Sequence, residues 1–289
     1  MLFSAEPLPP VTEGTREAYA EYSYTVAAEG ENFVYRYRLM RPLKVDPSEE
    51  YPLVIFLHGA GERGVDNTSQ LAYLPALLAL PEMRQKYPAF VLVPQCPLGQ
   101  RWVDEDWASA VPKPHGAPTL SMQAVMGMLD DVTTRLPVDR QRVILTGLSM
   151  GGYGVWDLAM RQPSRFARLV PVCGGGDPKQ VGRLRAGDIW AWHSADDPVV
   201  PVERSRLMIE ALRAAGGSPQ YSELQGAGHA SWQHAYRSEE LLNWMFQPPP
   251  RSRWPWIALL AAVLAAGGWA VAKMRRTAAA NPQVRHPQV

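Results

Sequence analysis

The sequence predicts an α/β fold: a mostly parallel central sheet with helices on both faces and an antiparallel hairpin at the N-terminal end. Short apolar runs without polar alternation, which are typical of strands buried on both faces, alternate along the chain with segments of helical spacing. Such connections are right-handed crossovers between parallel strands. Two segments of alternating apolar and polar residues precede them, separated by AEGEN, which favours a hairpin.

The elements follow in chain order. The hairpin is expected from residues 22–27 and 33–40. The buried strands that follow it are expected at residues 53–59, 90–93, 142–146, 169–173 and 189–193, with a short last strand at 220–224. The helices between them are expected at residues 67–80, 120–136, 149–160, 202–215 and 231–246. One long irregular stretch, residues 94–118, interrupts the pattern, and a loop of that length is typically functional.

A chain of 289 residues accommodates one large α/β domain and a small appendage. We expect a loosely ordered segment over residues 1–18, the α/β domain over 19–247 and a proline-rich linker over 248–253. A transmembrane helix over 254–272 and a basic tail over 273–289 complete the chain.

The membrane prediction rests on WPWIALLAAVLAAGGWAVA, a run without a charge that is long enough to cross the hydrocarbon core as a helix. Its tryptophans stand near both ends, where aromatic rings favour the interface. The alternative is a buried helix of the domain. The segment has no polar face, and the prolines that precede it end the domain, so both observations argue against a buried helix.

The N-terminus lacks the basic start and apolar run of a signal peptide. We therefore expect a single-pass C-terminal anchor with the large domain on the cytoplasmic side. Basic residues both precede and follow the apolar segment, and the excess after it favours the reverse topology, so a periplasmic domain stays open.

Composition excludes other classes of partner. A formal net charge of +1 leaves no basic field for nucleic acid. Cysteine and histidine do not show the spacing of a zinc site. Cys96 and Cys173 each follow an expected buried strand, which favours small core residues over a disulfide.

GLSMG stands between the expected strand RVILT and an expected helix. In that context a G-x-S-x-G pentapeptide forms a sharp strand-to-helix turn that holds the serine at its apex in a strained conformation. The flanking glycines allow strand and helix to approach closely. Ser149 is therefore the predicted nucleophile, at a helix N-terminus where backbone N–H groups stabilise developing negative charge.

HGAGERG begins at His58, directly after the buried strand LVIFL. An HG turn at this place aims a backbone N–H at the substrate oxygen, so we predict an oxyanion hole from the N–H groups of Ala60 and Met150. His58 precedes the serine and belongs to the turn, which favours a packing role over that of catalytic base.

Two further loops supply an acid and a base. HSADDPVVP follows an expected strand, and Asp197 is its predicted acid, with Asp196 as the rival. GAGHASW places His229 on a glycine-rich loop before the last helix, as the predicted base. His234 is the rival base, but it lies inside a helical pattern.

The chain order Ser149, Asp197, His229 is that of the α/β-hydrolase fold and differs from the order in other serine-protease folds. It predicts attack of the serine on an acyl carbonyl, with the histidine as base and the aspartate fixing its tautomer. No metal or cofactor is expected. Three tryptophans are expected to line the substrate pocket: Trp102, Trp107 and Trp232. The alternative is that one or more of them packs under a loop.

Four segments carry a resemblance to a known group: LVIFLHGAGERGVDN, VLVPQCPLGQRW, GLSMGGYGVWDLA and GAGHASW. Over residues 30–247 the chain resembles the bacterial predicted-peptidase or esterase-like branch of the α/β-hydrolase superfamily, which is similar to phospholipase/carboxylesterases, feruloyl esterases and dienelactone hydrolases. The resemblance implies hydrolysis of carboxylic esters with the same three residues as the triad. The C-terminal apolar segment departs from the usual soluble form of these enzymes.

The sequence leaves three functions open. The first is a carboxylesterase acting on a small-molecule ester or thioester. The second is a serine peptidase, or a lipase or thioesterase at the membrane. The third is a membrane-anchored binding protein on an inactive hydrolase scaffold, against which the complete triad speaks. The oligomeric state has no signature in the sequence.

Overall fold

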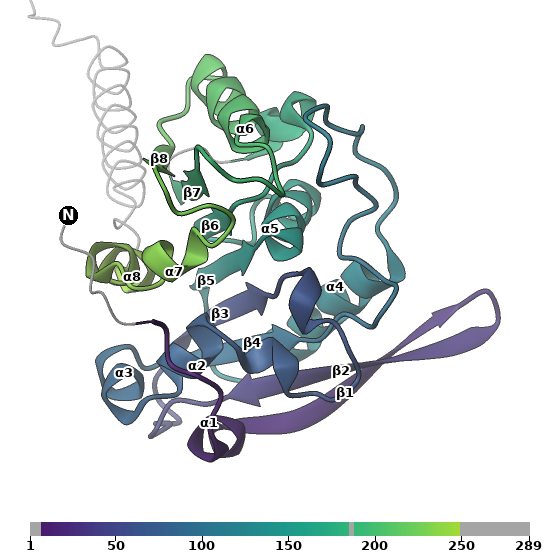
Figure 1. Cartoon of the computed structure of the whole chain (residues 1–289). Helices are drawn as coiled ribbons and strands as arrows, with labels where there is room; N and C mark the ends of the chain where they lie inside the picture. The colour runs from purple at the N-terminus through teal and green to yellow at the C-terminus, as the bar shows by residue number, and fades with distance from the viewer. Residues whose placement is uncertain (1–6, 185–187, 249–289) are drawn as a thin grey trace, which may run out of the picture. The chain divides into compact units, whose positions relative to one another are not determined.

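The computed structural model describes residues 7–184 and 188–248. Its centre is an eight-stranded sheet with the strand order β1-β2-β4-β3-β5-β6-β7-β8 (Figure 1). The strands are β1 (Tyr19–Ala28), β2 (Glu31–Met40), β3 (Tyr51–Leu57), β4 (Phe90–Pro94), β5 (Val138–Leu148), β6 (Arg168–Val172), β7 (Trp190–Ser194) and β8 (Gln220–Leu224). Strands β3 to β8 run parallel to one another, as their alternation with helices predicts.

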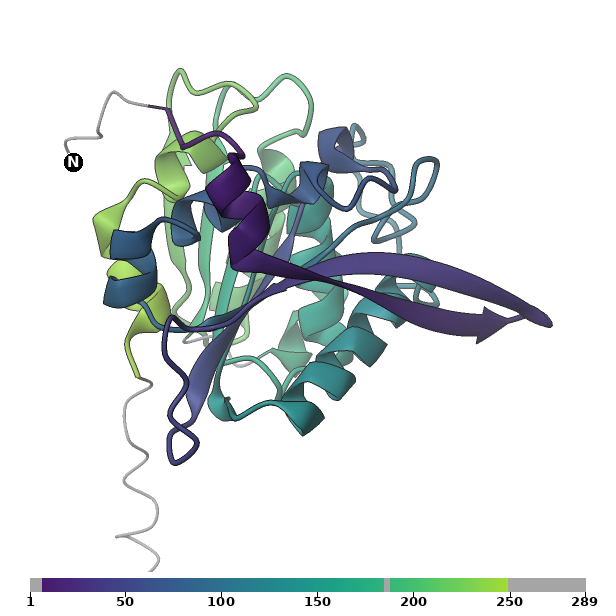
Figure 2. The same ribbon diagram turned by 90° about the horizontal axis from the view of Figure 1, so that it is seen from below.

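Strands β1 and β2 form the predicted antiparallel hairpin, and β2 pairs antiparallel with β4. The hairpin turns at Glu29 and Gly30, whose φ angles of 53° and 81° are those of a two-residue type I′ turn. It extends beyond the rest of the sheet (Figure 2). The sheet is therefore mixed, with its antiparallel part confined to the N-terminal strands.

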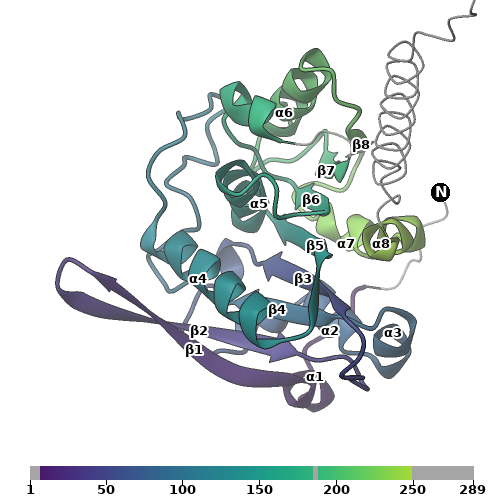
Figure 3. The same cartoon turned by 180° about the vertical axis from the view of Figure 1, so that it is seen from behind.

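Helices cover both faces of the sheet (Figure 3). They are α1 (Glu13–Ala18), α2 (Leu74–Leu78), α3 (Pro81–Lys86), α4 (Leu120–Arg135), α5 (Met150–Arg161), α6 (Glu203–Ala214), α7 (Trp232–Ala235) and α8 (Glu239–Phe246), with 3-10 turns η1 (Ala60–Glu62), η2 (Ser69–Leu71) and η3 (Pro178–Arg183). Alternate residues of β3 serve the two faces. Leu53, Ile55 and Leu57 pack with α4, α5 and α6, whereas Val54 and Phe56 pack with α2, α7 and α8. This two-sided burial explains why the strand sequences are continuously apolar.

Two predicted helices are interrupted. The sequence predicts one helix over 231–246, but the backbone of Ser238 is extended, and its side chain accepts the N–H of Leu241 to begin a new helix, α8. The sequence also predicts one helix over 67–80. There Tyr73 has a φ of 67°, which separates η2 from α2.

The N-terminal stretch is more ordered than the sequence predicts. Residues 13–18 form α1, because Thr12 and Thr15 bond each other's backbone N–H groups in a capping box. The described residues up to Gln247 belong to one compact unit. No helix within the described ranges is long and apolar enough to span a membrane. The transmembrane helix predicted over 254–272 lies outside those ranges.

Candidate active site

The strand-to-helix turn predicted from GLSMG lies between β5 and α5. Ser149 has a φ of 53°, in the left-handed region that non-glycine residues rarely adopt, and its N–H donates to the carbonyl of Val172 at 2.9 Å. Strained backbone of this kind clusters at active sites, where the surrounding structure holds it in place. The turn leaves the serine at the N-terminus of α5.

The glycines of the turn are required by backbone packing. A Cβ on Gly151 would lie 1.9 Å from the carbonyl oxygen of Leu57, at the end of β3. A Cβ on Gly147 would lie 2.6 Å from that same oxygen. Both contacts are with backbone atoms, which cannot move aside as a side chain does. The close approach of strand and helix expected from the sequence is therefore present.

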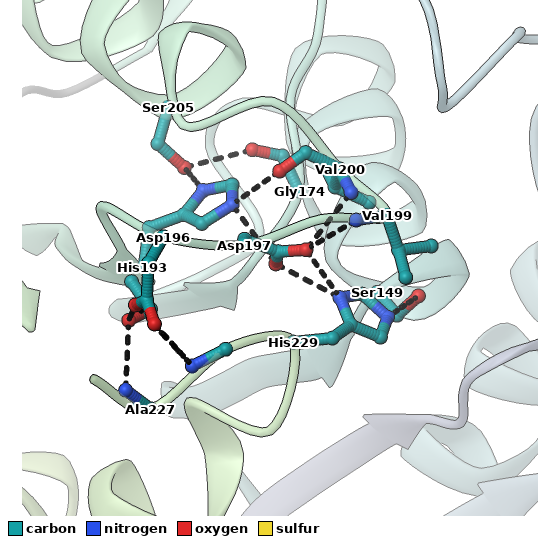
Figure 4. A network of polar contacts seen from close by, with 12 residues as sticks. Ser149, Gly174, His193, Asp196, Asp197, Val199, Val200, Ser205, Ala227 and His229 are labelled. Carbon is teal, nitrogen blue, oxygen red and sulfur yellow. Dashed lines mark hydrogen bonds and ion pairs between the residues drawn. The ribbon is translucent and has the colours of Figure 1, made fainter. Parts of the chain in front are cut away.

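Three side chains from distant parts of the chain form a continuous line of hydrogen bonds (Figure 4). The Nε2 atom of His229 lies 3.0 Å from the Oγ of Ser149. Its Nδ1 atom lies 2.8 Å and 3.0 Å from the two carboxylate oxygens of Asp197. The three residues follow β5, β7 and β8, so each lies beyond the carboxyl end of a parallel strand.

The carboxylate of Asp197 has no exposure to solvent. Burial acts to raise its pKa, but hydrogen bonds from His193, from His229 and from the N–H groups of Val199 and Val200 outweigh it and hold the pKa well below its usual range. The group is therefore an anion throughout the neutral range, which is what fixing and stabilising an imidazolium requires.

The rival acid, Asp196, has a different position. Its carboxylate accepts the hydroxyl of Ser194 and the N–H groups of Gly226 and Gly228, on the loop that carries His229. The first of these bonds also contributes most to lowering the pKa of Asp196. The carboxylate of Asp196 therefore links the loop that carries His229 to the end of β7, and its hydrogen bonds are to the backbone of that loop and not to the His229 ring.

The rival histidines also lie elsewhere. His58 is buried, its Nδ1 donates to the carbonyl of Gly59 at 2.6 Å and its Nε2 accepts the N–H of Cys96 at 3.0 Å. Burial lowers its pKa to about 4, so the ring is neutral at pH 7. These contacts match the packing role that the sequence favours. His234 lies within α7.

The two backbone N–H groups predicted for the oxyanion hole belong to the start of α5 and to the turn after β3. Met150 is the first residue of α5 and Ala60 the first of η1, so neither N–H has an acceptor within its own helix. The neighbour of Ala60, Gly59, packs against the end of β5, where a Cβ would lie 2.7 Å from the side chain of Leu148. The turn after β3 and the start of α5 thus meet beside Ser149.

The three tryptophans take different positions. Trp102 is buried, and its Nε1 donates to the carbonyl of His58 at 3.0 Å, so it takes the packing position that the sequence left open. Trp107 is half-buried under the guanidinium of Arg101, 5.0 Å from its ring centre. The half-buried ring of Trp232 lies edge-on to that of His229, with centroids 5.2 Å apart.

One residue that contacts the triad, His193, was not predicted from the sequence. The Nε2 of His193 lies 3.3 Å from the Oδ2 of Asp197, on the side away from His229. It stands four residues before the aspartate, in the same motif HSADDP. This spacing indicates that the histidine and the aspartate are near each other, but it does not show whether the His193 ring faces the carboxylate.

Within the described ranges, one group of side chains has the proximity of metal ligands: Cys173, Asp197 and His229, whose ligand atoms lie within 4.8 Å of one another. Burial raises the pKa of the Cys173 thiol to about 12, and a thiol binds metals only as the thiolate. The other two side chains already bond each other. The group therefore does not fit a resident metal ion.

Comparison with known proteins identifies the family of the chain. Residues 44–239 match the phospholipase/carboxylesterase family. No curated protein gives a significant match. A thermostable esterase of known structure is 36% identical, with a TM-score of 0.71 over 80% of this chain and 63% of its own. The chain thus spans less than two thirds of that esterase.

Peptidases of known structure share the fold at lower identity. An acylaminoacyl peptidase from Pyrococcus horikoshii is 17% identical, with a TM-score of 0.57 over 78% of this chain and 41% of its own. An acylaminoacyl peptidase in complex with Z-Gly-Gly-Phe-chloromethyl ketone is 15% identical, with a TM-score of 0.55 over 80% and 42%. These likenesses concern the fold alone. By its family match, the chain belongs to the phospholipase/carboxylesterase family of the α/β-hydrolase superfamily.

Proposed function

We propose that the chain is a serine esterase that cleaves carboxylic esters through an acyl-enzyme on Ser149. The observation that carries the proposal is the unbroken line from Ser149 Oγ through His229 to Asp197, with hydrogen-bond distances of 2.8 to 3.0 Å. A nucleophile, a base within reach of its proton and a third group that orients the base are the parts that covalent acyl transfer needs.

The steps follow from these positions. The oxygen of Ser149 bonds to the ester carbon while its proton passes to His229 Nε2, and Asp197 accepts Nδ1–H and stabilises the imidazolium. The N–H groups of Ala60 and Met150 donate to the oxyanion. The intermediate expels the alcohol, which takes the proton from Nε2. Water then attacks the acyl carbon and gives a proton to Nε2, and that proton passes to Oγ of Ser149 as its bond to the acyl group breaks and the acid leaves.

The comparisons favour an ester over an amide. The relative with 36% identity is an esterase, whereas the peptidases are 17% identical or less. We place Trp232 beside the entering substrate, because its ring lies next to the base and packs on Tyr73. Trp107 is the second proposed wall of the pocket.

A substrate panel tests the reaction class. Full-length protein is assayed on p-nitrophenyl acetate, p-nitrophenyl palmitate, an acyl thioester and a peptide p-nitroanilide, with Ser149→Ala as the matched control. We expect turnover of at least one carboxylic ester, much slower turnover of the anilide, and neither with Ser149→Ala. Faster cleavage of the anilide than of any ester would contradict the proposal in favour of a peptidase.

We also propose that residues 254–272 anchor the chain in a membrane, with the hydrolase domain on the cytoplasmic side. The uncharged run of spanning length supports the anchor. Fractionation should recover the full chain with membranes and residues 1–247 without them. Added protease should leave the domain intact in spheroplasts. Digestion of the domain there would reverse the topology, and a full chain absent from membranes would refute the anchor.

A further inference from the structure

A second histidine lies behind the triad (Figure 4). His193, at the end of β7, is fully buried. Its Nε2 lies 3.0 Å from the carbonyl oxygen of Val200 and 3.3 Å from Oδ2 of Asp197. Its Nδ1 lies 2.8 Å from the hydroxyl of Ser205, on α6. Both ring nitrogens are therefore within hydrogen-bond distance of oxygen atoms.

One arrangement of protons makes every contact of this ring a hydrogen bond. The carbonyl of Val200 only accepts, so Nε2 of His193 carries a hydrogen. Ser205 has a single hydroxyl proton, and its oxygen lies 2.8 Å from the carbonyl oxygen of Gly174, which only accepts. Both contacts of this hydroxyl are hydrogen bonds only if it donates to Gly174 and accepts from Nδ1 of His193, which then carries a hydrogen as well. A ring with a hydrogen on both nitrogens is an imidazolium.

The same accounting gives the opposite result at His58. There one nitrogen donates to the carbonyl of Gly59 and the other accepts the N–H of Cys96, so only one carries a hydrogen. That ring is neutral, in agreement with a pKa that burial lowers to about 4. The two buried histidines thus differ because their neighbours offer different atoms.

The charges around His193 suit a cation. A buried charge needs a partner, and the carboxylate of Asp197 provides it on the neighbouring loop. From β8, Glu223 stands opposite His193 in the strand register and pairs in turn with Arg206 of α6 at 2.6 Å. From the end of β6 comes Cys173, whose thiol is uncharged because burial raises its pKa to about 12.

We infer that His193 is held as an imidazolium that shares the carboxylate of Asp197 with His229, and that it acts as a positioning residue for the base. This inference rests on the proposed role of Ser149 and His229 in ester cleavage. The positive charge offsets part of the carboxylate's negative charge and so disfavours protonation of His229. It thereby keeps the base free to accept the serine proton at lower pH.

The pH profile of ester cleavage tests the effect. Ser205→Ala removes the acceptor of Nδ1–H, so it favours loss of that proton while leaving the ring beside Asp197. In full-length protein we expect the acid limb of kcat/KM on p-nitrophenyl acetate to move up by about one pH unit, the scale of a nearby charge. His193→Gln should do the same, and Ser205→Thr, which keeps the hydroxyl, should retain the wild-type profile.

The matched control is Ser121→Ala, which removes another buried hydroxyl, in α4, that donates to Gln100 and not to the triad. Its acid limb should stay in place. If Ser205→Ala lowers the rate equally at every pH, Ser205 and His193 only support the fold, and the inference is wrong.

The protonation state of His193 can be measured by NMR without any substrate. The chain has six histidines, so selective ¹⁵N-histidine labelling of the full-length protein gives few side-chain signals, and His193→Gln assigns one of them. We expect both ring nitrogens of His193 to carry a proton at the pH of the esterase assay. One unprotonated nitrogen at that pH would overturn the inference. Absence of esterase activity in the wild type would instead refute the proposed function and leave this reading valid.

Discussion

Adjacent aspartates face different parts of the site because the chain turns between them after β7. Asp197 lies inward, between two histidine rings, whereas Asp196 binds the backbone of the loop that carries the base. Asp197 therefore affects the charge and tautomer of His229, whereas Asp196 affects the position of the loop that carries it.

Asp197→Asn should lower kcat by about 10⁴-fold, because an amide no longer holds the tautomer that leaves Nε2 free to accept the serine proton. Asp196→Asn should reduce kcat far less, since an amide oxygen still accepts the N–H groups of Gly226 and Gly228. Steady-state kinetics on one ester compares the two variants. If the larger loss follows Asp196→Asn, the assignment of the acid is wrong.

At the scale of single residues, the sequence predicted which side chains come together at the site better than how they are protonated. Ser149, Asp197 and His229 stand in motifs whose place after a strand is visible in the sequence, and the structure brings them within hydrogen-bond distance. His193 has no such signal, because its role depends on the hydroxyl of Ser205 and a carbonyl from another loop. Only the folded chain shows which atoms face its ring.

The strand-to-helix turn is the element on which the site depends. Gly151→Ala would place a Cβ 1.9 Å from the carbonyl oxygen of Leu57, so β3 or α5 must shift. We expect a lower melting temperature and at least a tenfold lower kcat, since a 1 Å displacement near the reacting groups costs about 10²-fold. Gly182→Ala is the matched control, because a Cβ there meets no atom within 4 Å. Equal activity and stability of the two variants would show that the turn tolerates a side chain.

Element boundaries were harder to predict than element types. Continuous apolar runs identified the parallel strands, because burial on both faces removes polar residues from them. The helix predicted over 231–246 is divided by the side-chain cap of Ser238, and the one over 67–80 by the positive φ of Tyr73. Both breaks depend on local backbone geometry, which cannot be recognised from the spacing of apolar residues along the sequence.

At the scale of the whole molecule, stability depends on keeping His58 neutral. Burial lowers its pKa to about 4 in the folded chain, against an ordinary value of 6.5. The unfolded chain therefore binds an extra proton between these values, and stability falls as pH drops through that window. The group accounts for roughly 3 kcal/mol of the loss.

Urea denaturation at pH 7 and pH 4.5 measures this change. We expect the free energy of unfolding to fall less over that interval in His58→Gln than in the wild type, because glutamine does not titrate. An identical fall in both proteins would show that other groups cause the acid sensitivity.

The parallel sheet explains how residues far apart in sequence reach one site. Parallel strands end at the same edge, so the loops after β5, β7 and β8 deliver Ser149, Asp197 and His229 to one place. The strand order, with β4 outside β3, could not be predicted from apolar patterning, which identifies buried strands but not their neighbours. The candidate site could be predicted because its motifs mark the ends of strands.

Covalent labelling tests the central claim, that Ser149 is an activated nucleophile. The full-length protein is incubated with a fluorophosphonate, and its intact mass and peptide map are recorded. We predict one adduct, on Ser149, with labelling abolished in Ser149→Ala, much slower in His229→Ala and retained in His58→Ala. Unlabelled wild type, or an adduct that persists in Ser149→Ala, would contradict the account.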